Sequence, residues 1–223
     1  MSLVLAFDCA ISGLGVAVVG DGVCLASLRE EGREQAARLL PAIASVLQQA
    51  RVDRRELSLI AVTIGPGSFT GVRVGLAAAR GLAMALGVPL AGIATTAALL
   101  AQAERHDDGR LVVAAIDSRL GDWFCAIDEG RSAPFLASTA ELARRLKDRP
   151  SLVVGPQAEA LVPSLEQALA QTALPDPVAI ARLGLADGIE AWRVRNRTDG
   201  LPRPLYLRGV NVTSPDGTRR TVD

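Results

Sequence analysis

Short apolar runs separated by turn residues open the chain and predict three strands. The runs are residues 3–7, 15–19 and 23–28. Asp21-Gly22 stands between the last two, and an Asp-Gly pair between apolar runs is a strong hairpin signal. The first run ends at Asp8 and leads into a second tight turn. We therefore expect a three-stranded antiparallel meander.

The hydrophobic period then lengthens and predicts helices that alternate with strands. Apolar residues over 33–50 recur three and four apart, which indicates an amphipathic helix. An apolar run over 57–64 is typical of a buried strand. We expect a helix over 69–86, about 27 Å long at 1.5 Å per residue, and Gly87 would close it. A strand over 89–93 and a further helix complete the first half.

This order, three strands in a meander and then helix-linked strands, differs from that of a dinucleotide-binding fold. It is the order of the ribonuclease-H-like core that actin-type ATPases use twice. The second half begins the pattern again, with strands over 112–116 and 123–127, a short strand at Leu136, a helix over 139–148, a strand over 152–154 and helices over 158–171 and 178–194. The sequence therefore predicts an α/β protein with the duplicated actin-like ATPase (ASKHA, ribonuclease-H-like) fold. Its two βββαβα-type domains would be residues 1–105 and 106–223, with a cleft between them and a polar tail.

Asp8 and Asp117 occupy matching places in the two halves, each at the end of a first strand. The glycine-rich segment 64–76 joins a strand to a helix, with Ser68 placed as the N-cap. Free amides at a helix N-terminus attract anions. We therefore expect an anion or nucleotide contact made by Asp8, Gly65, Gly67, Ser68, Thr70 and Asp117. The alternative is that the two carboxylates accept hydrogen bonds from turn amides.

One ridge of the helix over 69–86 carries almost no side chain, because small residues recur every four positions: Gly71, Gly75, Ala79, Ala83 and Gly87. A glycine inside a helix costs about 1 kcal/mol relative to alanine, so close approach of another backbone is the physical explanation. Either the chain's own sheet or a partner helix could supply that backbone. Arg73 and Arg80 lie on a second stripe, which suits an exposed or interface face.

Scarce residues exclude several kinds of chemistry. The chain has one histidine, His106, in a polar loop where we interpret it as solvated, so sites with two histidines cannot be built. No G-x-x-x-x-G-K-[ST] motif is present, which excludes a P-loop. The formal net charge is zero, and three cysteines lie within apolar runs. We expect a cytoplasmic protein with reduced thiols, no metal site and no segment that crosses a membrane.

The motifs together resemble the bacterial TsaB (YeaZ) family. The resemblance is carried by Asp8, by the string Gly65-Pro66-Gly67-Ser68-Phe69-Thr70-Gly71, by residues 115–119 and by Pro204-Leu205-Tyr206-Leu207-Arg208, a patch that we expect to dock on the body of the protein. Cys9-Ala10 replaces the usual Thr-[Ser/Ala] after the first aspartate, and Gln35 replaces a histidine that many relatives have.

The resemblance implies a non-catalytic subunit of the complex that transfers threonylcarbamoyl to the adenosine beside the anticodon of ANN-decoding tRNAs. It implies assembly with the catalytic relative TsaD and the ATPase TsaE, a homodimer when alone, and contact with tRNA only through the complex. No cofactor is required, although a nucleotide could bind at the subunit interface. The interface helices would be those over 33–50 and 69–86, which contribute Leu39, Ile43, Gly71, Arg73, Gly75, Ala79 and Arg80. The alternative function is an ATP-using actin-like enzyme or a glycoprotease-like peptidase.

Overall fold

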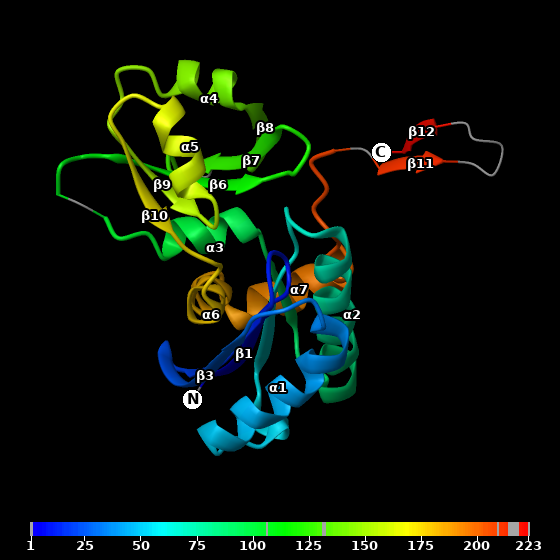
Figure 1. The fold of residues 1–223 in the computed structure, drawn as a ribbon. Coiled ribbons are helices and arrows are strands. Elements are labelled where there is room, and N and C mark those ends of the chain that lie inside the picture. Colours follow the sequence, from blue (N-terminus) through cyan, green and yellow to red (C-terminus); the bar gives the residue numbers. More distant parts are fainter. Residues whose placement is uncertain (1, 106, 131–132, 209, 214–218, 223) are drawn as a thin grey trace.

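The computed structural model describes residues 2–105, 107–130, 133–208, 210–213 and 219–222. The predicted loop histidine, His106, lies outside these residues. Within them, two five-stranded mixed sheets with helices follow one another along the chain (Figure 1). The predicted repetition of one plan is confirmed.

The first sheet has the strand order β3-β2-β1-β4-β5. Its strands are β1 (Leu3–Asp8), β2 (Leu14–Gly20), β3 (Val23–Glu30), β4 (Leu59–Thr63) and β5 (Leu90–Ile93). The first three form the predicted antiparallel meander, and β4 and β5 run parallel to β1. Asp21 and Gly22 in the β2–β3 turn have φ values of 46° and 83°, as a two-residue hairpin loop requires.

Alternate residues of β1 enter two different cores because successive side chains of a strand point to opposite faces. Leu5 and Phe7 pack with α1 (Gln35–Ala50) and α2 (Phe69–Leu86). Val4 and Ala6 pack with Ile180 and Trp192 from the C-terminal helices. The first sheet is therefore covered on both faces.

The predicted helix over 69–86 is confirmed as α2. The Ser68 hydroxyl accepts a hydrogen bond from the Gly71 amide at 3.2 Å and so caps the N-terminus. Gly87 follows the last turn with φ 67°, the left-handed conformation that ends many helices. Both ends of the helix were therefore encoded locally.

The second sheet has the order β10-β9-β6-β7-β8. Its strands are β6 (Leu111–Asp117), β7 (Asp122–Ile127), β8 (Phe135–Ser138), β9 (Ser151–Gly155) and β10 (Ala168–Thr172), with helices α3 (Thr95–Ala101), α4 (Thr139–Arg145) and α5 (Ala158–Leu161). The predicted helix over 158–171 is wrong, because α5 ends at Leu161 and β10 pairs in parallel with β9. Pairing with a neighbouring strand overrides the helical preference of an alanine-rich segment.

The predicted helix over 178–194 is divided in two at Gly188, which has φ 85°. The resulting α6 (Pro177–Ala186) contacts β1 and β2, and α7 (Ile189–Thr198) contacts β5. The chain thus returns to the first sheet, whose second apolar face these helices cover. The boundary between residues 1–105 and 106–223 stays a prediction. A hairpin of β11 (Val210–Thr213) and β12 (Arg219–Val222) follows (Figure 1).

The expectation that no segment could cross a membrane needs correction for α2. Its 18 residues have a mean hydropathy of 1.3, so its length and composition alone would suffice. The apolar composition has another explanation, because Leu76, Ala79 and Ala83 are buried against the chain's own sheet.

Candidate functional site

Asp8, the last residue of β1, is 1% exposed, and neighbouring residues of the chain donate hydrogen bonds to its carboxylate. Its Oδ1 accepts hydrogen bonds from the Thr63 hydroxyl at 2.6 Å and from the Ala10 amide at 2.9 Å. Oδ2 has no partner among the described residues. Burial raises the pKa of this carboxyl above its ordinary value, and the two hydrogen bonds and Arg29 oppose that rise only in part.

Asp117, the last residue of β6, has the same kind of local partner. Its Oδ1 accepts a hydrogen bond from the Arg119 amide at 2.7 Å. The alternative that the strand-end carboxylates bind turn amides is therefore confirmed for both residues. They differ in exposure, because Asp117 is only partly buried and faces a cleft.

This cleft lies between the two halves and has a volume of about 600 Å³. The predicted residues Gly67, Ser68, Thr70 and Asp117 line it together, whereas Asp8 and Gly65 do not. Sequence reasoning did not assign the other polar residues of its walls to this site, namely Ser12, Arg33, Gln35, Ser118, Arg119 and Gln157. Ser118 and Arg119 had a signal, because they lie in the string 115–119 that resembles the family and in the turn after β6.

The glycines at the start of α2 are explained by a close approach of two backbones. A Cβ at Gly67 would lie 2.2 Å from the Ala10 carbonyl oxygen, and one at Gly71 would lie 1.9 Å from that of Cys9. The Ser68 amide donates to the Ala10 carbonyl at 2.5 Å. The amides of Ser68 and Gly71 are thus already used within the chain. An anion or nucleotide contact at this loop stays a prediction.

Four of the five small residues on the ridge of α2, namely Gly71, Gly75, Ala79 and Ala83, are buried within the chain itself. Gly75 lies beside Val62 and Cys9, at 3.5 and 3.6 Å from the position of a Cβ, and Ala79 is fully buried. On α1, Leu39 and Ile43 are 1% and 4% exposed. Leu39, Ile43 and Ala79 pack in the core of the first sheet, and Gly71 is buried as well. Direct contact of these residues with a partner stays a prediction.

The two arginines of α2 have different roles. Arg80 is partly buried, and its Nη2 donates to the Pro202 carbonyl of the chain's own tail at 2.6 Å. The guanidinium is therefore directed to the chain's own tail, and a contact of Arg80 across an interface stays a prediction. Arg73 is exposed, and its guanidinium lies 3.3 Å from the centroid of the Phe69 ring. The Phe69 ring in turn stacks on Tyr206 at 5.7 Å.

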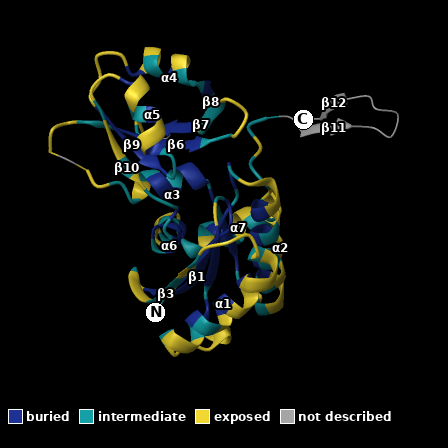
Figure 2. Ribbon diagram, in the orientation of Figure 1, coloured by how far each residue is buried: buried dark blue, intermediate teal, exposed yellow. Residues whose placement is uncertain are grey.

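Large apolar side chains remain exposed on the outer faces of α1 and α2 (Figure 2). Leu40 is 57% exposed, Phe69 is 45% exposed and Met84 is 75% exposed. We call these exposed residues, together with Arg73, the outer face of α1 and α2. Of the interface residues expected from the sequence, Arg73 is among these exposed residues, whereas Leu40, Phe69 and Met84 were not selected from the sequence.

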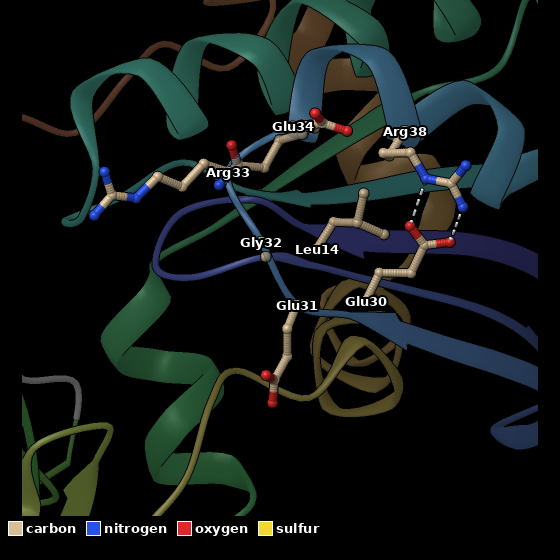
Figure 3. Close-up of a pocket in the computed structure, with 9 residues that line it drawn as sticks. Leu14, Glu30, Glu31, Gly32, Arg33, Glu34 and Arg38 are labelled. Carbon is tan, nitrogen blue, oxygen red and sulfur yellow. Dashed lines mark hydrogen bonds and ion pairs between the residues drawn. The ribbon is translucent and has the colours of Figure 1, made fainter.

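A second hollow of about 420 Å³ lies where β3 leads into α1 (Figure 3). Glu30 and Arg38 face each other across it, and Arg38 Nε and Nη2 each donate to a Glu30 carboxylate oxygen at 2.9 Å. Hydrogen bonding to Arg38 holds the pKa of Glu30 below its ordinary value. This pair joins the end of β3 to the first turn of α1, and Glu31, Arg33 and Glu34 also line the hollow.

Comparison with known proteins gives a consistent result. Residues 29–180 match the model of the family described as tRNA N6-adenosine threonylcarbamoyltransferase (TsaD). The tRNA threonylcarbamoyladenosine biosynthesis protein TsaB of Bacillus subtilis is 30% identical over 163 residues, which are 68% of this chain and 70% of that protein. The structure of YeaZ from Pseudomonas aeruginosa superposes with a TM-score of 0.74 at 30% identity and covers 93% of this chain and 100% of its own. The chain belongs to the TsaB (YeaZ) family.

The matched part of the chain spans about half the length of some curated relatives. TsaB of Escherichia coli is 35% identical over 55% of this chain and 53% of its own length. A polyphosphate/ATP-glucomannokinase from Arthrobacter aligns at 13% identity with a TM-score of 0.51, covering 85% of this chain and all of its own, which shows a shared fold alone. The predicted duplicated actin-like fold is confirmed by these neighbours and by the two sheets.

Proposed function

We propose that this protein is a non-catalytic subunit of the complex that transfers threonylcarbamoyl to the adenosine beside the anticodon of ANN-decoding tRNAs. Membership of the TsaB family carries the proposal, because relatives in two bacteria are named for threonylcarbamoyladenosine biosynthesis. The protein would act in the cytoplasm and would contact tRNA through the complex.

The side chains present support a role in binding more than one in turnover. Among the described residues, no three His, Cys, Asp or Glu side chains come together as a metal site would need. The oxygen Oδ1 of Asp8 is already bound to Thr63 and Ala10, and Asp8 does not line the cleft. Function has to be argued from the site and not from the fold, and this site lacks a full acid–base set.

The outer face of α1 and α2 is the surface that we propose for the partners, TsaD and TsaE, and for a homodimer when the chain is alone. Exposed apolar groups beside an arginine are the composition of many protein interfaces. Leu40 and Met84 would be covered by a partner, and Arg73 would supply a polar contact. The bidentate geometry of a guanidinium suits a carboxylate of the partner.

Loss of the protein should lower threonylcarbamoyladenosine in ANN-decoding tRNA, measured by mass spectrometry of tRNA nucleosides from a depleted strain. Met84→Asp should weaken binding to TsaD and reduce the modification, because it places a charge in an apolar contact. Leu169→Asp is the matched control, since Leu169 is an exposed leucine, 43% exposed, on β10 of the second half. Normal modification in a deletion strain without a paralogue would refute the assignment.

The alternative enzyme function is tested on the purified chain. We expect no steady-state release of phosphate from ATP above background. Turnover that disappears in Asp8→Asn would replace the proposed function by that of an ATP-using actin-like enzyme. Cleavage of a glycoprotein substrate by the same preparation would favour the peptidase alternative.

A further inference from the structure

The segment after α7 crosses the molecule in an extended path, and we call residues 201–208 the strap. It runs beside the N-terminal end of α2 and reaches the second half before the terminal hairpin (Figure 1). Leu201 packs against the core beneath α2. The Leu205 amide donates to the Ile64 carbonyl at 2.7 Å, immediately before the glycine-rich loop. The predicted docking of this part of the tail is thus confirmed.

Three residues of the first half, Gly65, Gly92 and Arg80, accommodate the strap. A Cβ at Gly92 would lie 2.6 Å from Pro202 Cβ, and a Cβ at Gly65 would lie 2.9 Å from the Leu205 carbonyl oxygen. The Arg80 guanidinium donates a hydrogen bond through Nη2 to the Pro202 carbonyl at 2.6 Å. The two glycines therefore leave room for the strap, and the Arg80 guanidinium holds it by a hydrogen bond. We call Gly65, Gly92 and Arg80 the seat of the strap.

The far end of the strap belongs to the second half. Arg208 forms an ion pair with Asp122, the first residue of β7. Between the seat and this pair, Tyr206 stacks on Phe69 at 5.7 Å, and Phe69 lines the cleft between the halves. The strap therefore bridges the two halves beside the mouth of that cleft.

Besides the strap, the chain passes between the two sheets twice: through α3, which contacts β6 of the second sheet and α6 on the first, and through residues 173–176. Gln102 ties them together, since its Nε2 donates to the Leu174 carbonyl at 2.8 Å and its Oε1 accepts from the Asp176 amide at 2.6 Å. Figure 1 shows both crossings beside α3 and α6, away from the strap. Two crossings held at one place form a hinge, and a third tie elsewhere restrains rotation about it.

We propose that the strap is a latch that fixes the width of the cleft, and that release of the Arg208–Asp122 pair lets the second half pivot about the two crossings. This inference does not depend on the proposed function, because it concerns the isolated chain. In this proposal the tail connects its seat on the first half to β7 of the second sheet and so restrains the motion of one half relative to the other.

The test measures one distance between the halves by pulsed EPR with nitroxide labels on Cys24 and on a cysteine introduced as Glu159→Cys. Both positions are exposed, and they lie on β3 and α5. Cys9 and Cys125 stay unlabelled at neutral pH because burial raises the pKa of each thiol to about 12. The parent protein should give a single narrow distribution.

Arg208→Ala should broaden this distribution and shift it to longer distances, and Asp122→Asn should do the same. The exchanged pair, Asp122→Arg with Arg208→Asp, should restore the narrow distribution. Arg149→Ala is the control, because it breaks a comparably exposed ion pair with Glu129 inside the second half.

Superposition of the Arg208→Ala and Asp122→Asn distributions on that of the parent would overturn the proposal. Equal broadening in Arg149→Ala would also overturn it, since the effect would not be specific to the strap. If Arg208→Ala loses its circular dichroism signal, Asp122→Asn and the exchanged pair still decide the matter.

Discussion

The close approach of α2 to the turn after β1 can be tested with two alanine substitutions on one helix. At Gly71, a new Cβ would lie 1.9 Å from the Cys9 carbonyl oxygen, whereas the shortest tolerated separation is 3.0 Å. The start of α2 must therefore move away by more than 1 Å. That movement would stretch the hydrogen bond from the Ser68 amide to the Ala10 carbonyl, which is 2.5 Å long.

The magnitudes separate the two variants clearly. Overpacking costs about 1–3 kcal/mol, and a weakened hydrogen bond adds about 0.5–1.5 kcal/mol. The helix propensity of alanine returns at most about 1 kcal/mol, so Gly71→Ala should be less stable than the parent by about 0.5–3.5 kcal/mol. At Gly81 nothing lies within 4 Å of the new Cβ. Gly81→Ala should therefore be more stable by up to about 1 kcal/mol.

Urea unfolding followed by circular dichroism measures both changes as free energies of unfolding. Tryptophan fluorescence adds a signal from the core of each sheet, since Trp123 packs with the second sheet and Trp192, on α7, packs with the first. Equal denaturation midpoints for Gly71→Ala and Gly81→Ala would refute the close approach. A Gly75→Ala variant should lie between them, because its nearest atom is 3.5 Å away.

Two further predictions concern titratable groups. Burial raises the pKa of Asp8 in the folded state above its ordinary value of 3.8. The folded protein therefore keeps the carboxyl proton at a higher pH than the unfolded chain does. The free energy of unfolding consequently falls as the pH rises above 3.8. The free energy of unfolding of Asp8→Asn should therefore gain on that of the parent as pH rises through this window, and a constant difference would contradict the raised pKa. Ellman's reagent at pH 8 should modify only Cys24 quickly in the folded protein, because Cys9 and Cys125 are buried with thiol pKa values near 12. Cys24→Ser should abolish that phase, and three fast thiols would contradict the structure.

Elements with local signals could be predicted from the sequence. The Asp21-Gly22 turn fixes the β2–β3 hairpin because only certain residues adopt its positive φ values. Ser68 and Gly87 fix the two ends of α2, since capping involves residues close in sequence. The resemblance to the TsaB family likewise rests on contiguous strings, and the comparisons confirm it.

Tertiary structure decided everything that depended on which surfaces meet. The alanine-rich segment 168–172 became a strand because β9 offered it a hydrogen-bonding edge, and α6 returned to the first sheet because that sheet has two apolar faces to cover. The spacing of Gly71, Gly75 and Ala79 showed that something packs closely on α2. It could not show that the neighbour is the chain's own turn at Cys9, because spacing records the size of a side chain and not the identity of its contact. For the same reason the place of Arg33 and Arg119 in the cleft became visible only when the two halves were placed side by side.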